Sequence, residues 1–552
     1  MSFSTVSASI YPCLVGNKKM ESLKHKPLFT VYLDKRVVSV FLMGISQGLP
    51  WVMIGSALTI WLKEGGVSRT DIGFAALIYG VYSINFFWSP LVDQLTLPFH
   101  KHLGRRKSWI LFCQLFICIA CASMSFFEPT ASAKALVLTA LAVAVFSATQ
   151  DISIDAYRID SFASHETRHI SAAAAAATAG WWTGYSGIGY VPLALSDLNW
   201  SWPELYQILA VIMATVALIT TLLPHPLHAA NNSPKDYYDN YLLKVKRVEN
   251  TLRYKLMLML CCPIALCVWA IAGSPGLPSA FSGRSTYPLE IVGLVILFSV
   301  LIGKLLTQIE AAANSASLSN YPAATQASYF DKVLAWLLGS VVEPIKDFFS
   351  RNPVKLALAI LGFIFLFKIG EAFLGRMSVV FYKEVGFSNT DIANYSKMLT
   401  WWLTIVFALI GGLINARFGI VKGLVVSGCA MAASNLMFAW IAHAGPNIDL
   451  YIATIIVDGF AQAWSTVAFV SFISMLCSHS FSATQYALLA SLASLARSTL
   501  SSASGLIVDW LNGNWSLFFV LTTLMVIPSL LLLYSIRKPI TRIEQDAKNQ
   551  KE

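Results

Sequence analysis

The 552-residue sequence contains few charged residues. Asp, Glu, Lys and Arg make up 12% of the chain and hydrophobic residues 56%, whereas a soluble domain usually has about 25% charged residues. So few charges cannot cover the surface of a soluble globular protein of this length. This excludes a soluble enzyme, a disordered chain and an ordinary nucleic-acid-binding protein. The sequence instead predicts an all-α polytopic membrane protein whose apolar residues face the lipid bilayer.

Several chemical signatures are also missing. The nine cysteines show no disulfide framework, and most of them lie in apolar runs. Neither a phosphate-binding loop nor a dinucleotide-binding glycine pattern occurs, so the sequence gives no support for ATP-driven pumping and we expect no cofactor. The net charge of +10 does not indicate a nucleic-acid partner, because Lys and Arg accumulate in the cytoplasmic loops of membrane proteins.

Apolar runs long enough to cross a bilayer, about 20 residues each, recur along the chain. We expect fourteen spans, near residues 37–62, 72–95, 108–127, 133–157, 170–194, 205–224, 255–273, 287–309, 355–382, 391–415, 420–443, 450–476, 483–510 and 515–536. Most of the 39 Lys and Arg then fall in cytoplasmic segments. This distribution predicts that both termini are cytoplasmic.

The predicted spans fall into two sets of six around an inserted pair. The expected segments are a cytoplasmic tail (1–34), an N-terminal six-helix lobe (35–226), a cytoplasmic linker (227–254), two extra transmembrane helices (255–309), a second linker with an amphipathic surface helix (310–354), a C-terminal six-helix lobe (355–537) and a cytoplasmic tail (538–552). A 6+6 organisation is typical of a transporter built from two repeated halves, which we expect to act as a monomer.

Charged residues inside spans cost roughly 2.5–3.5 kcal/mol each to insert and therefore indicate function. Asp151 and Asp155 lie four residues apart, on one face of the predicted fourth span. Two close, desolvated carboxylates favour proton uptake, so we expect this pair to couple transport to protons. Alternatively, Asp155 pairs with Arg158 as a latch at the cytoplasmic end, and the two interpretations are compatible.

The C-terminal half contains a second group of charged residues. Lys368 and Glu371 lie one helical turn apart, so they either neutralise each other or form a midplane pair that opens to bind substrate or a proton. Arg497 has no acidic residue three or four positions away on its predicted helix, and we expect it to bind a substrate carboxylate. Asp458 is predicted to lie nearer the outer surface, as a gating charge.

A loop between the second and third predicted spans contains Asp93, followed by Arg105 and Arg106. We expect a cytoplasmic charge lock there, Asp93 with Arg105 or Arg158, which breaks when the two halves move. The alternative is that these basic residues only set the topology. The pattern is similar to the signature loop of the major facilitator superfamily.

Tryptophans occur at many helix positions, where most such residues anchor the interface or pack. The tryptophans at such positions are Trp51, Trp88, Trp181, Trp182, Trp401, Trp402 and Trp464, and any of them that faces a cavity could stack on the apolar face of a sugar ring. One further motif, His165-Glu-Thr-Arg-His169, matches the HExxH zinc-protease pattern, and Asp458 could supply a distant ligand. An intramembrane metalloprotease is therefore a remote alternative, but we expect no metal site and no enzyme, because five residues match easily by chance.

Segments in both halves together resemble the AmpG-type muropeptide permeases, a branch of the major facilitator superfamily. They are GISQGLP (44–50), FWSPLVD (87–93), GRR (104–106), SATQDISIDA (147–156), VEPIKDFFSRN (342–352), KIGEAF (368–373) and CSHSFSATQYALL (477–489). The resemblance implies proton-driven import of GlcNAc-1,6-anhydro-muropeptides across the bacterial inner membrane, for peptidoglycan recycling and β-lactamase induction signalling. This sequence differs from the family in two respects. Its extra helix pair is predicted between the two halves, and Glu371 occupies a position where aspartate is common.

A sugar-peptide substrate implies stacking aromatics, amides and cations in the binding site. We expect Lys368 and Arg497 to contact its carboxylates, Trp182 to contact its rings, and three amides, Gln47, Gln462 and Gln485, to contact its polar groups. The alternative is a carrier on the same scaffold for another small molecule such as acetyl-CoA, a siderophore or a drug.

Overall fold

The computed structural model describes residues 28–67, 78–226 except 80 and 197, ten isolated positions between 239 and 336, and 338–549 except 389, 390 and 502. These residues form α-helices with short 3-10 and π-helical segments, and no strand occurs among them. The predicted all-α class is confirmed. Within the described ranges, nine helices are long and apolar enough to cross a membrane. The count of fourteen spans is not confirmed, and the pair predicted at 255–309 lies outside the described residues.

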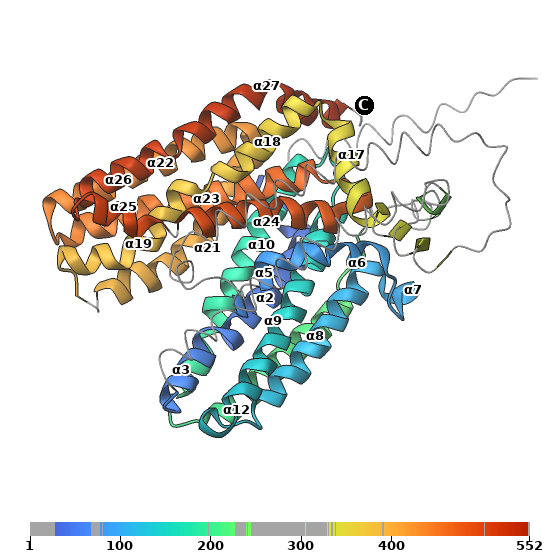
Figure 1. Ribbon diagram of the computed structural model, residues 1–552, viewed down its shortest axis with the longest axis horizontal. Helices are drawn as coiled ribbons and strands as arrows, with labels where there is room; N and C mark the ends of the chain where they lie inside the picture. Colours follow the sequence, from blue (N-terminus) through green and yellow to red (C-terminus); the bar gives the residue numbers. More distant parts are fainter. Residues whose placement is uncertain are drawn as a thin grey trace, which may run out of the picture.

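The first lobe is built from the N-terminal half of the chain. Its elements are η1 (Leu28–Leu33), α2 (Lys35–Ile54), α3 (Ser56–Glu64), α5 (Val81–Ile84), η3 (Asn85–Phe87), α6 (Ser89–Gln94), α7 (His100–Leu103), α8 (Arg105–Met124), α9 (Pro129–Asp160), α10 (Thr167–Trp182), η4 (Thr183–Ile188), α11 (Tyr190–Ser196) and α12 (Trp202–Leu222). Figure 1 shows α8, α9 and α12 running side by side in this lobe.

The second lobe is built from the C-terminal half. Its elements are η6 (Leu338–Val342), α17 (Glu343–Arg351), α18 (Val354–Leu366), α19 (Ile369–Val385), η7 (Ile392–Leu399), α21 (Thr400–Phe418), α22 (Ile420–Ala444), α23 (Ile448–Leu476), η8 (His479–Phe481), α24 (Ser482–Ser501), α25 (Ser504–Trp510), α26 (Trp515–Leu524) and α27 (Ile527–Asn549). The second predicted linker, which was expected to contain a surface helix, thus includes η6 and α17, and these directly precede α18.

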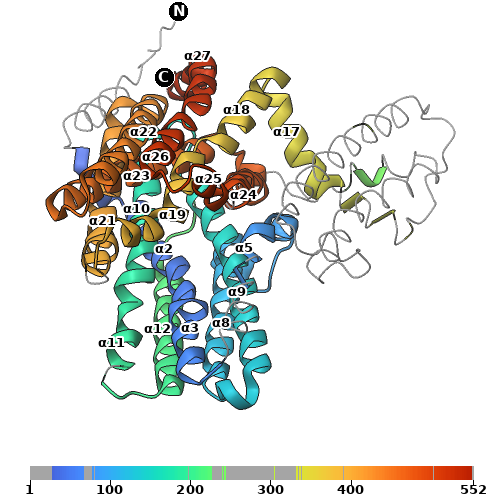
Figure 2. The same cartoon turned by 60° about the vertical axis from the view of Figure 1, so that its left-hand side comes forward.

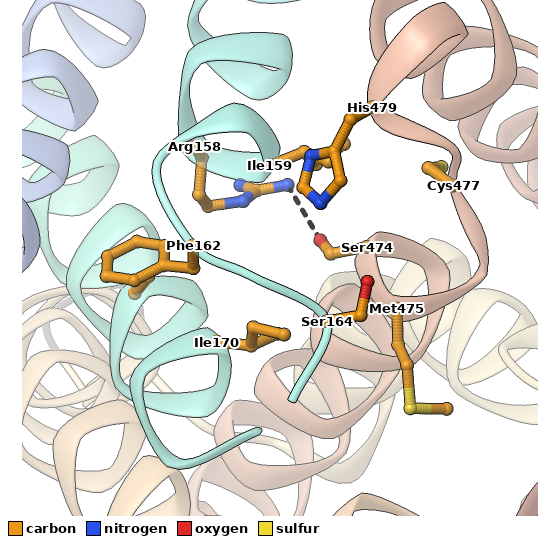
Figure 3. Close-up of a pocket in the computed structure, with 10 residues that line it drawn as sticks. Arg158, Ile159, Phe162, Ser164, Ile170, Ser474, Met475, Cys477 and His479 are labelled. Atoms are coloured by element: carbon orange, nitrogen blue, oxygen red, sulfur yellow. Dashed lines mark hydrogen bonds between the residues drawn. The ribbon is translucent and has the colours of Figure 1, made fainter. Parts of the chain in front are cut away.

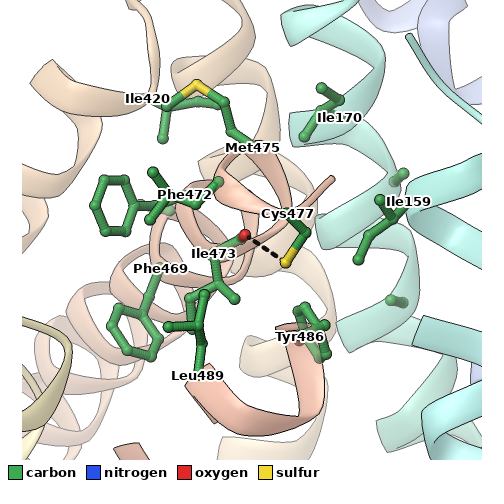
Figure 4. Packing of buried hydrophobic residues seen from close by; sticks show 14 of the residues in the cluster. Ile159, Ile170, Ile420, Phe469, Phe472, Ile473, Met475, Cys477, Tyr486 and Leu489 are labelled. Carbon is green, nitrogen blue, oxygen red and sulfur yellow. Dashed lines mark hydrogen bonds between the residues drawn. The ribbon is translucent and has the colours of Figure 1, made fainter. Parts of the chain in front are cut away.

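The lobes meet at one end of the molecule, where α7, α17 and the end of α27 lie. We call this end the tail side. Figures 1 and 2 show the other ends of the two lobes diverging from this region. Apolar side chains from both lobes form one core at the tail side. Ile159 and Ile170 of the first lobe lie beside Met475 and Cys477 of the second (Figure 4).

Both lobes repeat one interaction at the end opposite the tail side. Trp202, at the start of α12, donates its indole N–H to Glu64 at the end of α3, with an N···O distance of 2.5 Å. Trp515, at the start of α26, donates to Glu384 near the end of α19, at 2.8 Å. In each lobe the last long helix is thereby fastened to the first, which is the arrangement expected of two structural repeats.

Glycines allow α2 and α10 to pack closely. A Cβ atom on Gly180 would lie 2.2 Å from the carbonyl oxygen of Phe41, and one on Gly48 would lie 2.1 Å from that of Trp181. Because no side chain fits at these points, the two backbones approach each other as small-residue helix pairs do in membranes. This contact brings the faces of α2 and α10 that carry Gln47, Trp51 and Trp181 together.

Candidate functional site

A buried charged cluster joins the lobes at the tail side. Arg106, on the first turn of α8, donates to Asp160 and to Asp93 at 2.8 Å each, and its side chain has no exposed area. The same guanidinium donates to the hydroxyl of Ser482, at the start of α24, at 2.8 Å. A fully buried cation needs such partners because an unpaired buried charge is very costly.

The carboxylate of Asp93 also crosses to the second lobe. It accepts hydrogen bonds from the backbone N–H and the hydroxyl of Thr484, at 2.8 and 2.6 Å. Arg105 instead donates to the backbone carbonyl of Asp93 at 3.0 Å. The predicted pairing of the Asp93 carboxylate with Arg105 or Arg158 is therefore wrong, since its charged partner is Arg106. The one-residue difference arises because Arg106, not Arg105, points inward on α8.

Arg158 forms a second contact between the lobes. It makes an ion pair with Asp155 at 2.9 Å, as the latch interpretation expects, and its guanidinium stacks over the ring of Tyr486 at 4.9 Å. It also donates to Ser474 at 3.4 Å (Figure 3). The pocket in that view is lined by both lobes and lies against His479, whose ring is 3.7 Å from Asp160.

Asp151 lies one helical turn deeper in α9 than Asp155, and both residues are half-buried. The side chain of Gln47 lies near both carboxylates, and its amide N–H donates to the backbone carbonyl of Asp151 at 3.5 Å. The Oδ1 atom of Asp151 is shielded from solvent and has no hydrogen-bond partner. The structure thus brings Gln47, Asp151, Asp155 and Arg158 together in one polar group.

Lys368 occupies a break between two helices of the second lobe. α18 ends at Leu366 and α19 begins at Ile369, and such interruptions in a membrane-spanning segment expose polar backbone at binding sites. The Lys368 ammonium contacts the carboxylate of Glu371 and donates to Ser465 at 2.8 Å and Thr466 at 3.0 Å. All three of its N–H groups therefore have acceptors, and the pair is closed in this structure.

Two further polar residues extend this group along α23. Asp458 accepts from Gln462 at 2.6 Å and from Ser434 at 2.8 Å. The hydroxyl of Ser465, which contacts Lys368, donates to the backbone carbonyl of Gln462 at 3.0 Å. Arg497 on α24 is exposed, forms no ion pair with a described residue, and lies close enough for its charge to act on Lys368.

Gln485 lies apart from both groups. Its amide donates to Pro344 and Asp347 of α17, at 2.8 Å each, and its carbonyl accepts from Arg351 and from the backbone of Ser478. The structure therefore places this predicted binding residue in the contact between α17 and α24. Trp182 is half-buried and packs edge-on against Trp181.

The HExxH motif lies at the tail side of the first lobe. α10 begins only at Thr167, so His165 and His169 do not share a helix as the two histidine ligands of a zinc protease do. Glu166 accepts two hydrogen bonds from Arg36, at 3.0 Å each. Among the residues that the structure describes, no group of three or more His, Cys, Asp or Glu is placed to hold a metal ion. The motif is here part of an ion-pair cluster.

That cluster links the start of α2 to the start of α10. Asp34 caps α2 and forms an ion pair with Arg36 at 3.0 Å, and His169 lies 3.5 Å from Asp34. Burial raises the pKa of the Asp34 and Glu166 carboxyls, but the hydrogen bonds and charge of Arg36 outweigh this effect. Both pKa values are therefore lower than usual.

Several residues of the site have weak signals in the sequence. Tyr486, Ser474 and Thr484 are not predictable, because a hydroxyl in a helix has no signature until its partner on another helix is known. Tyr79, Tyr82 and Tyr185 do have a usable signal, which is their spacing of three or four residues from each other or from Trp181.

Comparisons with known proteins agree with this architecture. A model of the Major Facilitator Superfamily matches residues 40–399. The Rickettsia felis protein named "Putative transporter AmpG 4" is 28% identical over 513 residues, which cover 92% of this chain and 98% of that protein. The anhydromuropeptide permease of Escherichia coli K12 is 25% identical over 519 residues, or 94% and 83% of the two chains.

Solved structures show the same fold at low identity. The proton:xylose symporter XylE bound to 6-bromo-6-deoxy-D-glucose superposes with a TM-score of 0.52 at 12% identity, covering 92% of this chain and 95% of the symporter. The similarity to AmpG-type permeases inferred from the motifs is confirmed. The fold, the family match and the named relatives lead to one conclusion: the chain belongs to the Major Facilitator Superfamily.

Proposed function

We propose that this protein is a proton-coupled permease that imports GlcNAc-1,6-anhydro-muropeptides across the bacterial inner membrane. The similarity to a protein named anhydromuropeptide permease, over 94% of this chain, supports the substrate class. In this proposal the protein works as a monomer with both termini in the cytoplasm. The imported muropeptides serve peptidoglycan recycling and supply the signal for β-lactamase induction.

The observation that supports proton coupling most directly is the unpaired carboxylate oxygen of Asp151. A carboxylate oxygen that is shielded from water and lacks a donor disfavours the ionised form of the group relative to the protonated form. Asp155, four residues away, is compensated by Arg158. We therefore assign proton uptake to Asp151, with Asp155 as the partner whose ion pair with Arg158 changes when Asp151 gains or loses its proton.

The membrane potential makes such coupling productive. A proton that moves inward with the substrate gains about 2.3 kcal/mol per 100 mV. With the tail side in the cytoplasm, the contacts of Arg106, Asp93 and Arg158 with α23 and α24 close the inner face. Release of substrate then requires these contacts to break, as in a rigid-body movement of two lobes.

The second lobe supplies the anion-binding groups. Arg497 is exposed and has no described ion-pair partner, and Lys368 lies at a helix break beside it. Glu371 neutralises Lys368 when no substrate is bound. In our proposal a substrate carboxylate contacts Arg497 and draws Lys368 away from Glu371, which is then able to take up a proton.

The test uses right-side-out membrane vesicles and radiolabelled anhydro-muropeptide with an imposed proton gradient. The double variant Asp151→Asn with Asp155→Asn should lose gradient-driven uptake while reaching the membrane in normal amounts. Asp509→Asn, an exposed aspartate on α25, is the matched control and should transport normally. Unchanged uptake by the double variant would remove the coupling assignment.

Uptake by the unmodified protein tests the substrate class separately. If it accumulates no labelled muropeptide but does accumulate acetyl-CoA, a siderophore or a drug, the assigned substrate is wrong and the carrier serves another small molecule. Accumulation of muropeptide only when a gradient is present supports both parts of the proposal.

A further inference from the structure

Six aromatic side chains form a continuous cluster in the first lobe. Trp51 lies at its centre, with ring-centroid distances of 5.1 Å to Tyr79, 4.6 Å to Tyr82 and 5.9 Å to Trp181. Trp181 in turn contacts Trp182 at 5.4 Å and Tyr185 at 5.0 Å. The members come from α2, from the segment that includes α5, and from the junction of α10 with η4.

Helical spacing aligns this cluster with the polar group around Asp151. Gln47 and Trp51 are four residues apart on α2, as are Asp151 and Asp155 on α9, so each pair shares a helix face. The amide of Gln47 donates to the backbone carbonyl of Asp151 at 3.5 Å, and both α2 and α5, which carry Trp51 and Tyr82, pack against α9. The rings and the carboxylates therefore border the same region of the lobe.

The second lobe offers a direct comparison, because it also contains an aromatic cluster. There Phe381, Phe438, Phe519 and Trp515 are all buried, and the Trp515 indole donates to Glu384. Every ring of the first-lobe cluster is instead half-buried, and the shielded indole N–H of Trp51 has no hydrogen-bond partner. The second-lobe cluster is packing core, whereas the first has open ring surface and an unused donor.

Two more features of this region are typical of a binding surface rather than of a packed core. Residues Thr183–Ile188, which include Tyr185, form a π-helical segment, a distortion that is frequent at functional sites. In addition, a Cβ on Gly187 of that segment would approach Trp401 of α21 to 3.2 Å, and the indole N–H of Trp401 is also buried without a partner. The cluster therefore extends to the boundary with the second lobe.

We propose that this first-lobe cluster is the carbohydrate subsite, so that the substrate binds with its sugar rings in the first lobe and its peptide in the second. Sugar rings present an apolar C–H face, which stacks on Trp51 or Trp181, and hydroxyl and acetamido groups, which pair with the Trp51 indole and with Asp151. The peptide carboxylates then reach Lys368 and Arg497 in the second lobe. This division rests on the proposed function, since it assumes a sugar-peptide substrate.

Binding measurements in lipid nanodiscs separate the two subsites. The probes are an anhydro-muropeptide and its disaccharide with the lactyl carboxyl amidated, which retains the rings but has no charge. Trp51→Leu should weaken the binding of both probes by about tenfold, because it removes an aromatic ring and an N–H donor. Lys368→Met should weaken the binding of the muropeptide and leave the binding of the amidated disaccharide unchanged. Trp440→Leu, at an exposed site on α22, is the matched control and should change neither.

Smaller substitutions keep the test valid if Trp51→Leu fails to fold, as judged by its thermal unfolding. Trp51→Phe retains a ring but lacks the indole donor, and Tyr82→Phe lacks only a hydroxyl. Trp51→Phe should weaken the binding of the amidated disaccharide severalfold, and Tyr82→Phe should weaken it by less.

The outcomes distinguish this inference from the proposed function. If the unmodified protein binds both probes and the Trp51 variants bind the disaccharide as tightly as it does, the carbohydrate subsite is elsewhere. If the unmodified protein binds neither probe, the proposed sugar-peptide substrate is wrong.

Discussion

The carboxylate of Asp93 accepts a hydrogen bond from the backbone N–H of Thr484, 2.8 Å away in the other lobe. Thr484 lies in the first turn of α24, which begins at Ser482. A carboxylate at this position satisfies a free helical N–H and faces the positive end of the helix dipole. The two lobes are thus held together by the N-terminus of a helix as well as by the Arg106 ion pair.

We predict that Asp93→Asn loosens this contact. The substitution removes a charge that Arg106 and Thr484 share, and breaking one partner of a buried ion pair costs about 3–5 kcal/mol. The buried thiol of Cys477, in the core between the lobes, should then react with a maleimide at least about tenfold faster. Labelling is measured at Cys477 by peptide mass spectrometry.

Asp509→Asn is the control, because Asp509 is exposed on α25. Cys477 labelling that stays at the unmodified rate in Asp93→Asn would show that the Asp93 contacts do not hold the lobes together.

The Lys368–Glu371 pair gives a second prediction. Their side chains are 8% and 17% exposed, so removing either partner leaves a largely buried charge. Lys368→Met and Glu371→Gln should each destabilise the protein by about 3 kcal/mol, whereas the double variant should recover most of this loss. A double-mutant cycle on thermal unfolding in detergent measures the coupling.

Transport by the same variants separates a structural role from a binding role. If the pair binds substrate or a proton as proposed, the double variant regains stability but not uptake. Recovery of both would indicate that the two residues only neutralise each other.

Much of this arrangement was predictable because a membrane penalises charge. Asp151, Lys368 and Glu371 stand out within apolar runs, and the free energy of inserting them implies partners or a function. Which partner each charge has was not predictable from the sequence. Arg105 and Arg106 are adjacent and identical in type, and only the rotation of α8 turns Arg106 toward Asp160.

The role of the aromatic cluster was likewise not predictable from the sequence. Tryptophan is common at membrane interfaces, so Trp51 had no distinguishing pattern in the sequence. Its role depends on the close packing of α2 against α10, which places Trp181 beside it. That packing depends in turn on glycines whose contacts lie more than a hundred residues away along the chain.

Those glycines give a third prediction. Gly48→Ala puts a Cβ about 2 Å from the carbonyl oxygen of Trp181, so the backbones of α2 and α10 must separate. We expect a loss of about 1–3 kcal/mol, seen as a lower midpoint of thermal unfolding, and a change in tryptophan fluorescence. Gly375→Ala on α19 is the control, since a Cβ there meets nothing within 4 Å and should be neutral or slightly stabilising. Equal stability of the two variants would contradict the packing argument.

The fourth prediction concerns acid and the ion pairs of Arg36. The pKa values of Asp34 and Glu166 are lowered in the folded protein, whereas in the unfolded chain they are about 3.9 and 4.3. The stabilisation they provide is therefore complete above those unfolded values and is lost as the pH falls through the folded ones. Arg36→Gln should lower the unfolding midpoint at pH 6 by an amount equivalent to about 1 kcal/mol, and this difference from the unmodified protein should shrink below pH 4. A difference that stays constant from pH 6 to pH 3 would mean that Arg36 stabilises the chain by packing over Phe162, 4.8 Å away, rather than through the two carboxylates.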